Sequence, residues 1–302
     1  MKQRLTVLIL YLSLILLNIQ CGETPITIDE RTYTPKIVVE GYLFPGQAVE
    51  KIRITRNFPL NRDIELAQIV IADATVRLSD VTTGSTYALS YDPFTFAYHY
   101  PGNDLAIDFE KTYRIEINAT IDNHNLNASS TTTVPGRGFQ IVPEKSRLDP
   151  LRYRQRDSQG NLQSFAVAFK RSPTTTFYVM SFVALEASRD NFISENLYGI
   201  RVDDIDDQDL NRLKYQSRWV ETFYEGFSIH YAEVSWLQIW FYGRYRVILY
   251  AGDKNFKDYF LTHGRIQDID GNLYEPKFHF EGDGIGVFGS ALVDTAYFEV
   301  IR

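Results

Sequence analysis

The chain has a single cysteine, Cys21, among its 302 residues. A disulfide needs two cysteines, so no intramolecular disulfide can form, and a cluster of thiolate metal ligands is excluded as well. Only five histidines are present, at positions 99, 124, 230, 263 and 279, and their spacing matches no metal-binding motif. We therefore expect a fold stabilised by apolar burial and hydrogen bonds, without a metal or a cofactor.

Positive charge is also scarce. Lys and Arg together number 31 against 38 Asp and Glu, which gives a formal net charge of −7. Removal of residues 1–20 would take away Lys2 and Arg4 and change the charge from −7 to −9. This balance argues against a nucleic-acid partner, because phosphates need a basic surface. It argues equally against docking onto anionic lipids through a basic patch.

The N-terminus has the pattern of an export signal. Two basic residues precede a mainly apolar run of 13 residues from Leu5 to Leu17. A membrane-spanning helix needs about 20 apolar residues, whereas a secretory signal peptide needs fewer. Cys21 follows at the place where bacterial lipoproteins are cleaved and lipidated. We predict a signal peptide at 1–20 and a lipidated tether at 21–35 that holds the protein to the membrane. An ordinary signal peptide or a membrane anchor is the alternative.

Residues 36–135 have the pattern of an all-β domain. The alternation is cleanest in Lys111–Ala119, where Tyr113, Ile115 and Ile117 point one way and the charged residues between them point the other. Short runs of this kind, separated by turn residues, favour an immunoglobulin-like or transthyretin-like β-sandwich. The predicted strands are 36–43, 49–54, 69–78, 86–90, 96–100, 111–119 and 125–134.

A polar segment at 136–160 is interpreted as a linker to a β-rich second domain at 161–302. Within the second domain, 253–263 is predicted to be a helix, with Asp253 as its N-cap and Gly264 as its stop. The other predicted elements are a strand pair at 165–170 and 177–187, a short helix at 206–215, strands at 234–242, 245–251 and 273–280 with a turn at 270–271 before the last, and one or two strands over 287–300. The whole chain is therefore expected to be mainly β with at least one α-helix.

Gly284, Gly286 and Gly289 fit the G-x-G-x-x-G spacing of dinucleotide-binding proteins. That fingerprint requires a following helix and an acidic residue about 20 positions further on. A β-rich segment follows instead, and only 13 residues come after Gly289. We interpret the motif as a glycine-rich turn packed against a sheet.

The acidic run from Asp203 to Asp209 contains five aspartates. Clustered carboxylates can bind Ca²⁺, but the glycine and terminal glutamate of a calcium-binding loop are missing. A solvated loop is the preferred interpretation, and calcium binding stays open. The sequence also has no G-x-S-x-G elbow and no H-E-x-x-H motif. We therefore expect no catalytic centre.

Aromatic residues make up 14% of the chain, and many of them gather between positions 219 and 245. All three tryptophans, Trp219, Trp236 and Trp240, lie in this segment. Exposed tryptophans stack on sugars or bind protein partners, so these three are candidate ligand or interface residues. The alternative, which we favour, is that the aromatic segment fills the core of the second domain.

Several short motifs resemble those of the DUF4249 family, a domain of unknown function found in predicted lipoproteins of Bacteroidota. They are PKIVVEGYLFPG at 35–46, ADATVRL at 72–78, KTYRIEI at 111–117, TTTVP at 131–135 and GDGIGVFGSA at 282–291. The resemblance implies an envelope protein often encoded near outer-membrane TonB-dependent receptors. It brings no established activity and no catalytic residues.

These observations lead to one main functional hypothesis and two alternatives. The main hypothesis is a non-enzymatic outer-membrane lipoprotein that serves as an accessory or binding component of a TonB-dependent uptake or cell-envelope system. The first alternative is a protein that binds or cleaves carbohydrate through its aromatic segment. The second is a structural or adhesive surface protein. Whether it faces the periplasm or the cell exterior is left open by the sequence.

Overall fold

A computed structural model describes residues 33–59, 64–220, 227–263 and 276–302. Cys21, the predicted signal peptide and most of the predicted tether lie outside these residues. The chain divides into two compact units, residues 1–34 with 58–63 and residues 35–57 with 64–302. The described residues of the first unit, 33–34 and 58–59, form no helix or strand. The helices and strands below belong to the second unit, and none of its described helices is long and apolar enough to cross a membrane.

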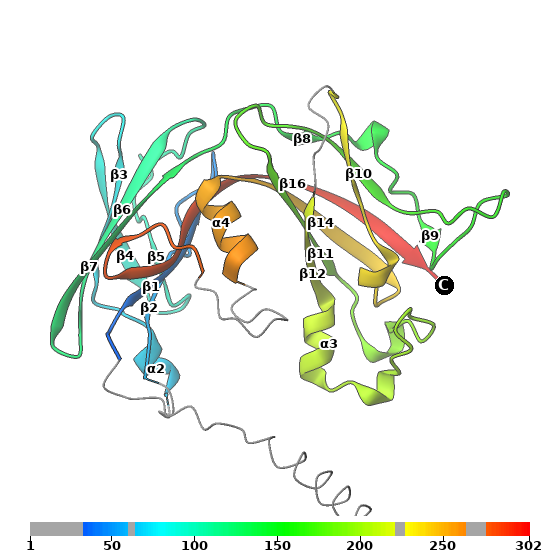
Figure 1. Cartoon of the computed structure of the whole chain (residues 1–302), viewed down its shortest axis with the longest axis horizontal. Helices are drawn as coiled ribbons and strands as arrows, with labels where there is room; N and C mark the ends of the chain where they lie inside the picture. The colour runs from blue at the N-terminus through cyan, green and yellow to red at the C-terminus, as the bar shows by residue number, and fades with distance from the viewer. Residues whose placement is uncertain (1–32, 60–63, 221–226, 264–275) are drawn as a thin grey trace, which may run out of the picture. The chain divides into compact units, whose positions relative to one another are not determined.

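The largest sheet has seven strands and is organised around the C-terminal strand β16 (Figure 1). Its order is β12 (Tyr215–Val220), β11 (Phe177–Ala184), β14 (Gly243–Gly252), β16 (Gly284–Ile301), β1 (Ile37–Leu43) and β2 (Arg53–Arg56), with β9 (Leu151–Arg152) pairing to the end of β16. The first part of β16 pairs in parallel with β1, and the rest pairs antiparallel with β14. The first and last of the described strands are therefore neighbours.

Two smaller sheets complete the β-structure. The six-stranded sheet has the order β15 (Glu281–Gly282), β7 (His124–Thr133), β6 (Thr112–Ile121), β3 (Thr75–Asp80), β4 (Thr86–Asp92) and β5 (Ala97–His99). The three-stranded sheet has the order β13 (His230–Glu233), β10 (Ala166–Lys170) and β8 (Gln140–Ile141). The first of these contacts β16 and β1 through β7, and the second contacts β16 through β8.

The helical elements are short. They are α2 (Leu66–Ile69), α3 (Asp207–Lys214) and α4 (Lys254–His263), with 3-10 turns η2 (Pro143–Lys145), η3 (Arg189–Asn191), η4 (Val202–Asp204) and η5 (Trp236–Gln238). The predicted mainly β, sandwich-like fold with at least one helix is confirmed.

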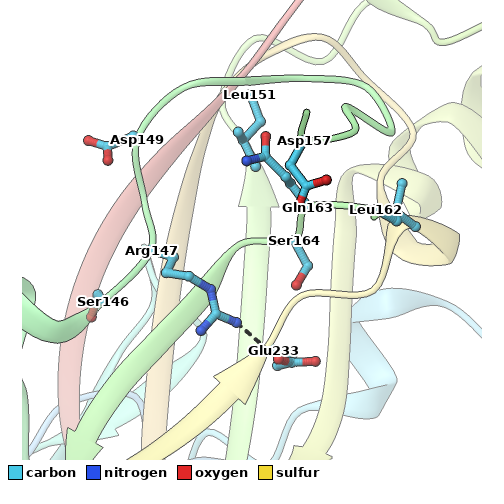
Figure 2. Close-up of a pocket in the computed structure, with 9 residues that line it drawn as sticks. All are labelled: Ser146, Arg147, Asp149, Leu151, Asp157, Leu162, Gln163, Ser164 and Glu233. Atoms are coloured by element: carbon cyan, nitrogen blue, oxygen red, sulfur yellow. Dashed lines mark hydrogen bonds and ion pairs between the residues drawn. The ribbon is translucent and has the colours of Figure 1, made fainter. Parts of the chain in front are cut away.

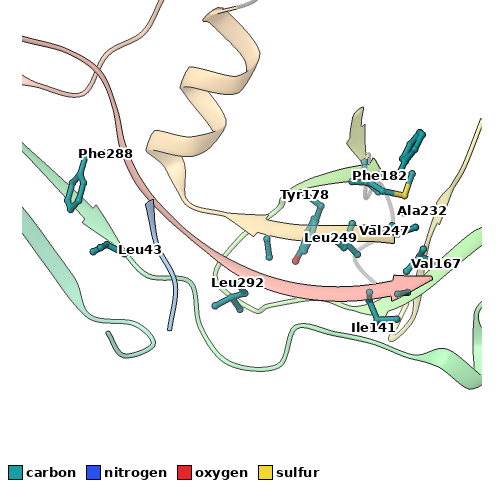
Figure 3. Packing of buried hydrophobic residues seen from close by; sticks show 14 of the residues in the cluster. Leu43, Ile141, Val167, Tyr178, Phe182, Ala232, Val247, Leu249, Phe288 and Leu292 are labelled. Atoms are coloured by element: carbon teal, nitrogen blue, oxygen red, sulfur yellow. The ribbon is translucent and has the colours of Figure 1, made fainter. Parts of the chain in front are cut away.

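The buried side chains form one continuous core that crosses all three sheets. Figure 3 shows labelled members from β1, β8, β10, β11, β13, β14 and β16. Rings dominate its centre: Phe298 stacks on Tyr245 at 4.9 Å between ring centroids and lies 4.2 Å from Phe165. Full burial of one such side chain contributes about 1.5–3 kcal/mol, so this core supplies the burial that the chain needs in place of disulfides.

Local alternation correctly predicted β6. Tyr113, Ile115 and Ile117 are buried, at 0–1% exposure, whereas the side chain of Glu116 is exposed. Cross-strand neighbours on β3, Val76 and Leu78, are buried on the same face. A period of two places every second side chain in the core, as a half-buried strand requires.

The predicted strand pair at 165–170 and 177–187 is wrong in its pairing. The two strands exist as β10 and β11, but β10 pairs with β13 and β8, whereas β11 pairs with β12 and β14. They lie in different sheets that share a core, where the Phe169 and Tyr178 rings are 5.1 Å apart. Adjacent strands in sequence need not pair, because a short connection can also cross between sheets.

The predicted strand at 234–242 is also wrong. This segment contains η5, and the Leu237 N–H donates to the Ser235 hydroxyl at 3.3 Å at the start of the turn. Both faces of the segment are apolar because it packs irregularly inside the core, with Ile239 and Phe241 nearly inaccessible. Periodicity cannot distinguish a buried strand from such a segment.

Three further predictions, one of a turn and two of strands, need correction. The glycine-rich stretch around Gly286 is part of β16 and is not a turn. The strand predicted to start at Ile69 starts at Thr75, after the one-turn helix α2. Of the strand predicted at 273–280, the described residues 276–280 form no strand, and the predicted turn at 270–271 and stop at Gly264 lie outside the described residues.

Both predicted helices are confirmed, and an aspartate caps each of them. Asp206 accepts the Asp209 N–H at 2.7 Å before α3, and Asp253 accepts the Phe256 N–H at 2.9 Å before α4. The Asp253 carboxylate also accepts the Thr132 hydroxyl at 2.7 Å. Burial raises the pKa of Asp253. The cap of α4 is therefore also a polar link between α4 and β7.

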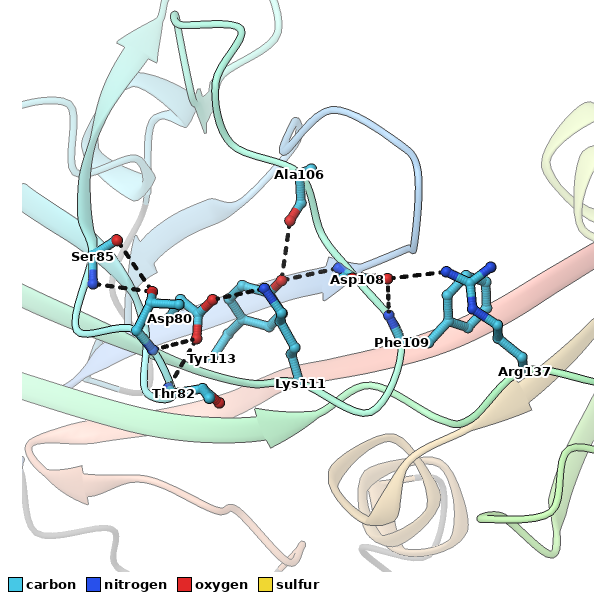
Figure 4. Close-up of polar contacts among 10 residues, drawn as sticks. Asp80, Thr82, Ser85, Ala106, Asp108, Phe109, Lys111, Tyr113 and Arg137 are labelled. Atoms are coloured by element: carbon cyan, nitrogen blue, oxygen red, sulfur yellow. Dashed lines mark hydrogen bonds and ion pairs between the residues drawn. The ribbon is translucent and has the colours of Figure 1, made fainter.

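A second polar cluster fixes the turns of the six-stranded sheet (Figure 4). The buried carboxylate of Asp80 accepts the Thr82 N–H at 2.8 Å and the Lys111 ammonium at 3.2 Å. The Tyr113 hydroxyl donates to the Ala106 carbonyl at 3.1 Å and accepts the Asp108 N–H at 2.9 Å. These bonds satisfy polar groups that burial would otherwise leave without partners.

The predicted domain limits at 36–135, 136–160 and 161–302 stay predictions. Several backbone bonds cross them. β1 pairs with β16, β15 pairs with β7, and residues 136–160 contribute β8 and β9 to the sheets. The second compact unit itself spans 64–302 without a division at 136–160.

Candidate ligand-binding cleft

A surface cleft of about 600 Å³ lies beside β10 and β13 (Figure 2). Its walls come from the segment between η2 and β10 and from the end of β13. The lining residues are Ser146, Arg147, Asp149, Leu151, Asp157, Leu162, Gln163, Ser164 and Glu233. Most of the lining is polar, and it combines carboxylates, hydroxyls, an amide and one guanidinium group.

Arg147 is held in place through its backbone. Its N–H donates to the Ala166 carbonyl at 2.8 Å, and its carbonyl accepts the Ala166 N–H at 3.0 Å. The side chain reaches across the cleft, where Nη2 lies 3.0 Å from Glu233 Oε1. These side chains are 54% and 63% exposed. Exposed pairs contribute about 0–1 kcal/mol, so a ligand can replace this contact at little cost.

The far wall is a tight turn built by Asp157. Its carboxylate accepts the N–H groups of Gln159 and Asn161, each at 2.9 Å. The Asn161 N–H lowers the pKa of Asp157, so the group is ionised at neutral pH. The backbone of Gln163 is also held in place, because its carbonyl accepts the Trp236 indole N–H at 2.7 Å.

A second hollow of about 400 Å³ shares Leu162, Ser164 and Glu233 with the cleft and extends it. Its lining is more apolar. Leu162, Leu197 and Leu237 are 45%, 40% and 47% exposed. Single exposed leucines are ordinary, but three around one hollow give an apolar surface beside a charged one.

The charges in the cleft define the ligands that it can accept. Asp149, Asp157 and Glu233 outnumber Arg147, so an anionic ligand would be repelled. Carboxylates accept hydrogen bonds from hydroxyl groups, whereas the guanidinium and the amide donate them. The cleft therefore suits a neutral or cationic ligand rich in hydroxyl or amine groups.

The three candidate tryptophans do not form one surface. Trp219 on β12 is 43% exposed, whereas Trp236 and Trp240 are 5% and 7% exposed. Trp236 packs edge-on against Tyr153, and Trp240 lies parallel to Tyr198 at 5.2 Å. Of the three, only Trp236 lines the neighbouring hollow that extends the cleft.

The aspartates of the acidic run are mostly engaged by local partners. Asp206 caps α3, Asp207 lies 2.8 Å from Arg189, and Asp209 lies 2.9 Å from Arg212. Over the described part of the chain, no three His, Cys, Asp or Glu side chains come together as metal ligands.

This cleft was not predicted from the sequence. Most of its lining lies at 146–164, where the pattern indicated a linker, and Glu233 is nearly 70 positions from that segment. The polar residues at 146–164 were a signal, but solvated linkers have the same composition. Only the pairing of β10 with β13 brings Glu233 to Arg147.

The molecule is a mainly β protein with a polar surface cleft beside β10 and β13. The chain belongs to the DUF4249 family, a domain of unknown function, whose sequence profile matches residues 23–296. This confirms the resemblance drawn from the short motifs.

Comparison with curated proteins found no match. A solved structure described as "Structural insight into host cell surface retention of a 1.5-MDa bacterial ice-binding adhesin" aligns at 10% identity with a TM-score of 0.21. The alignment covers 88% of this chain and 64% of that one, which is less than two thirds of its length. So low a TM-score supports no conclusion about fold or function.

Proposed function

We propose that this chain is a non-enzymatic binding protein of the cell envelope and that the Arg147 cleft is its ligand site. The observation that carries the proposal is the exposed Arg147–Glu233 pair inside an open cleft lined by hydrogen-bonding groups. A pair of this kind offers donors and acceptors to a ligand without the desolvation cost of a buried pair.

Membrane attachment through a lipid on Cys21 is the second part of the proposal. It is supported by the N-terminal sequence pattern, and a TonB-dependent receptor of the outer membrane is the partner that the family resemblance suggests. Labelling with a clickable palmitate analogue tests the anchor. Wild type should take up the label and Cys21→Ala should not, and protease shaving of intact cells would separate a surface-facing from a periplasm-facing protein. Equal labelling of both would refute the lipid anchor.

A neutral oligosaccharide is the ligand class that the cleft favours. Its carboxylates and guanidinium group match the hydroxyl groups of a sugar, and its excess of carboxylates disfavours anionic polymers. The neighbouring leucines would contact the apolar face of a sugar ring. A structural or adhesive role without a small ligand is the competing function.

An oligosaccharide array followed by titration of the strongest neutral binder tests the ligand site. Arg147→Gln is expected to weaken binding at least tenfold, since a charge-assisted hydrogen bond contributes about 1.5–3 kcal/mol. Arg53→Gln is the matched control, because Arg53 forms a similarly exposed pair with Glu40 (54% and 57%) outside the cleft.

Two results would overturn the proposal. One is unchanged binding by Arg147→Gln together with wild-type stability. The other is hydrolysis of a bound oligosaccharide that Glu233→Gln abolishes, because the protein would then be an enzyme. Absence of binding to every oligosaccharide would leave the adhesive role as the better function.

A further inference from the structure

Another pocket, separate from the Arg147 cleft and from the hollow that extends it, is lined by positively charged side chains. It has a volume of about 580 Å³ and lies where β10 ends, at Lys170. Lys170 and Arg171 line it side by side, and none of its described lining residues is acidic. The hydroxyl residues Thr176 and Ser228 and the 64%-exposed ring of Phe227 complete the wall. Two adjacent cations without an acid are notable in a chain of net charge −7.

The described part of the chain supplies no carboxylate partner to either cation. Within the described ranges, no carboxylate forms a salt bridge with Lys170 or Arg171. The Arg171 Nε atom is buried and has no hydrogen-bond partner there. A guanidinium donor removed from water without an acceptor is unfavourable, so an acceptor supplied by a ligand would be favoured.

The loop after Arg171 is fixed by buried hydrogen bonds. The Tyr178 hydroxyl accepts the Ser172 N–H at 3.1 Å and donates to the Thr175 carbonyl at 3.1 Å. The Ser172 hydroxyl donates to the Gly136 carbonyl at 2.8 Å, and the Thr174 hydroxyl accepts the Gly136 N–H at 2.5 Å. The two cations therefore stand at the start of a preorganised loop, which lowers the entropic cost of binding.

We propose that this pocket binds a phosphate group. Phosphate oxygens accept hydrogen bonds from an ammonium, a planar guanidinium and neighbouring hydroxyls, and no described residue of the lining is a carboxylate that would compete with them. The Phe227 ring provides an apolar surface for the remainder of the ligand. The phosphate would come either from a soluble phosphate compound or from the headgroup of a lipid.

Isothermal titration calorimetry of the full chain in dodecyl maltoside, at fixed ionic strength, tests the site. The probes are inorganic phosphate and dihexanoyl phosphatidylglycerol below its micelle concentration. Tighter binding of inorganic phosphate indicates a soluble source, and tighter binding of the lipid indicates a headgroup. In either case, the double variant Lys170→Gln/Arg171→Gln is expected to raise the Kd at least tenfold.

Arg77→Gln is the matched control, because Arg77 is an exposed cation on β3 in another sheet. It should leave the Kd unchanged, as should Arg147→Gln, so this test is independent of the proposed oligosaccharide site. If the double variant melts at a lower temperature, the exposed Lys170→Gln alone should still raise the Kd about threefold. Failure of both probes to bind, or equal binding by wild type and the Lys170 variants, would overturn the proposal.

Discussion

Gly286 is a position where the backbone of this fold leaves no room for a side chain. It lies in β16 opposite Val39 of β1, with φ of +104°. A Cβ atom built on Gly286 would lie 2.1 Å from the Val39 carbonyl oxygen. That oxygen belongs to the backbone of a buried strand, so it cannot move aside as the end of a flexible side chain could.

Gly286→Ala is therefore expected to be strongly destabilising. The positive φ alone costs a residue with a side chain about 1–3 kcal/mol. Relief of the clash requires β1 and β16 to separate, which costs at least one ladder hydrogen bond of about 1 kcal/mol and some core packing. Together these give about 3–5 kcal/mol, a large part of the roughly 5–15 kcal/mol by which a typical protein is stable.

Urea denaturation followed by circular dichroism measures this loss. Gly160→Ala is the control, because Gly160 has φ of +86° but no atom within 4 Å of an added Cβ. It isolates the backbone strain, and we expect it to cost about 1–2 kcal/mol. Equal losses for the two variants would refute the reasoning, since the close approach of β1 would then contribute nothing.

Three other predictions concern buried polar groups. Asp253→Ala should cost about 2–3 kcal/mol in urea denaturation, because α4 loses its cap and the Thr132 hydroxyl loses one of its two hydrogen-bond partners; a loss below 0.5 kcal/mol would contradict the cap. Burial raises the pKa of Asp80, but the N–H groups of Thr83 and Thr82 and the Lys111 ammonium lower it more, so its net pKa lies below the ordinary value. The Asp80 carboxylate therefore stabilises the fold above about pH 4, and this contribution is lost as the pH falls through the folded-state pKa. The free energy of unfolding of the wild type should decrease over this pH range, and that of Asp80→Asn should decrease less. Tyr245→Phe should cost about 1–3 kcal/mol, because the Tyr245 hydroxyl bonds both the N–H and the carbonyl of buried Phe241, each at 2.9 Å; an unchanged melting temperature would contradict this.

Features that depend on a few neighbouring residues were predictable from the sequence. The alternation of Lys111–Ala119 identified β6 because a strand with one buried face repeats every two residues. Asp253 identified the start of α4 as its N-cap, because a cap binds a backbone N–H only three residues away. Family membership was also predictable, since it rests on short motifs along the chain.

The burial of the candidate site residues and the position of the cleft could not be predicted from the sequence. Trp219, Trp236 and Trp240 are equivalent in the sequence, yet one is half-exposed and two are buried. The residues around Arg147 have the composition of a linker, although they line the cleft. Which aromatic side chains are buried, and which polar loop lines a cleft, depends on elements that are far away in the sequence.

The amino-acid sequence alone determined the β-rich class, the capped helix α4 and the absence of disulfides, because each follows from composition or from neighbours a few positions apart. Only the tertiary structure decided that β16 joins β1 to β14, that β10 and β11 lie in different sheets, and that Glu233 meets Arg147. Pairing between distant strands depends on how the whole chain buries its apolar faces together, and this balance has no local signature.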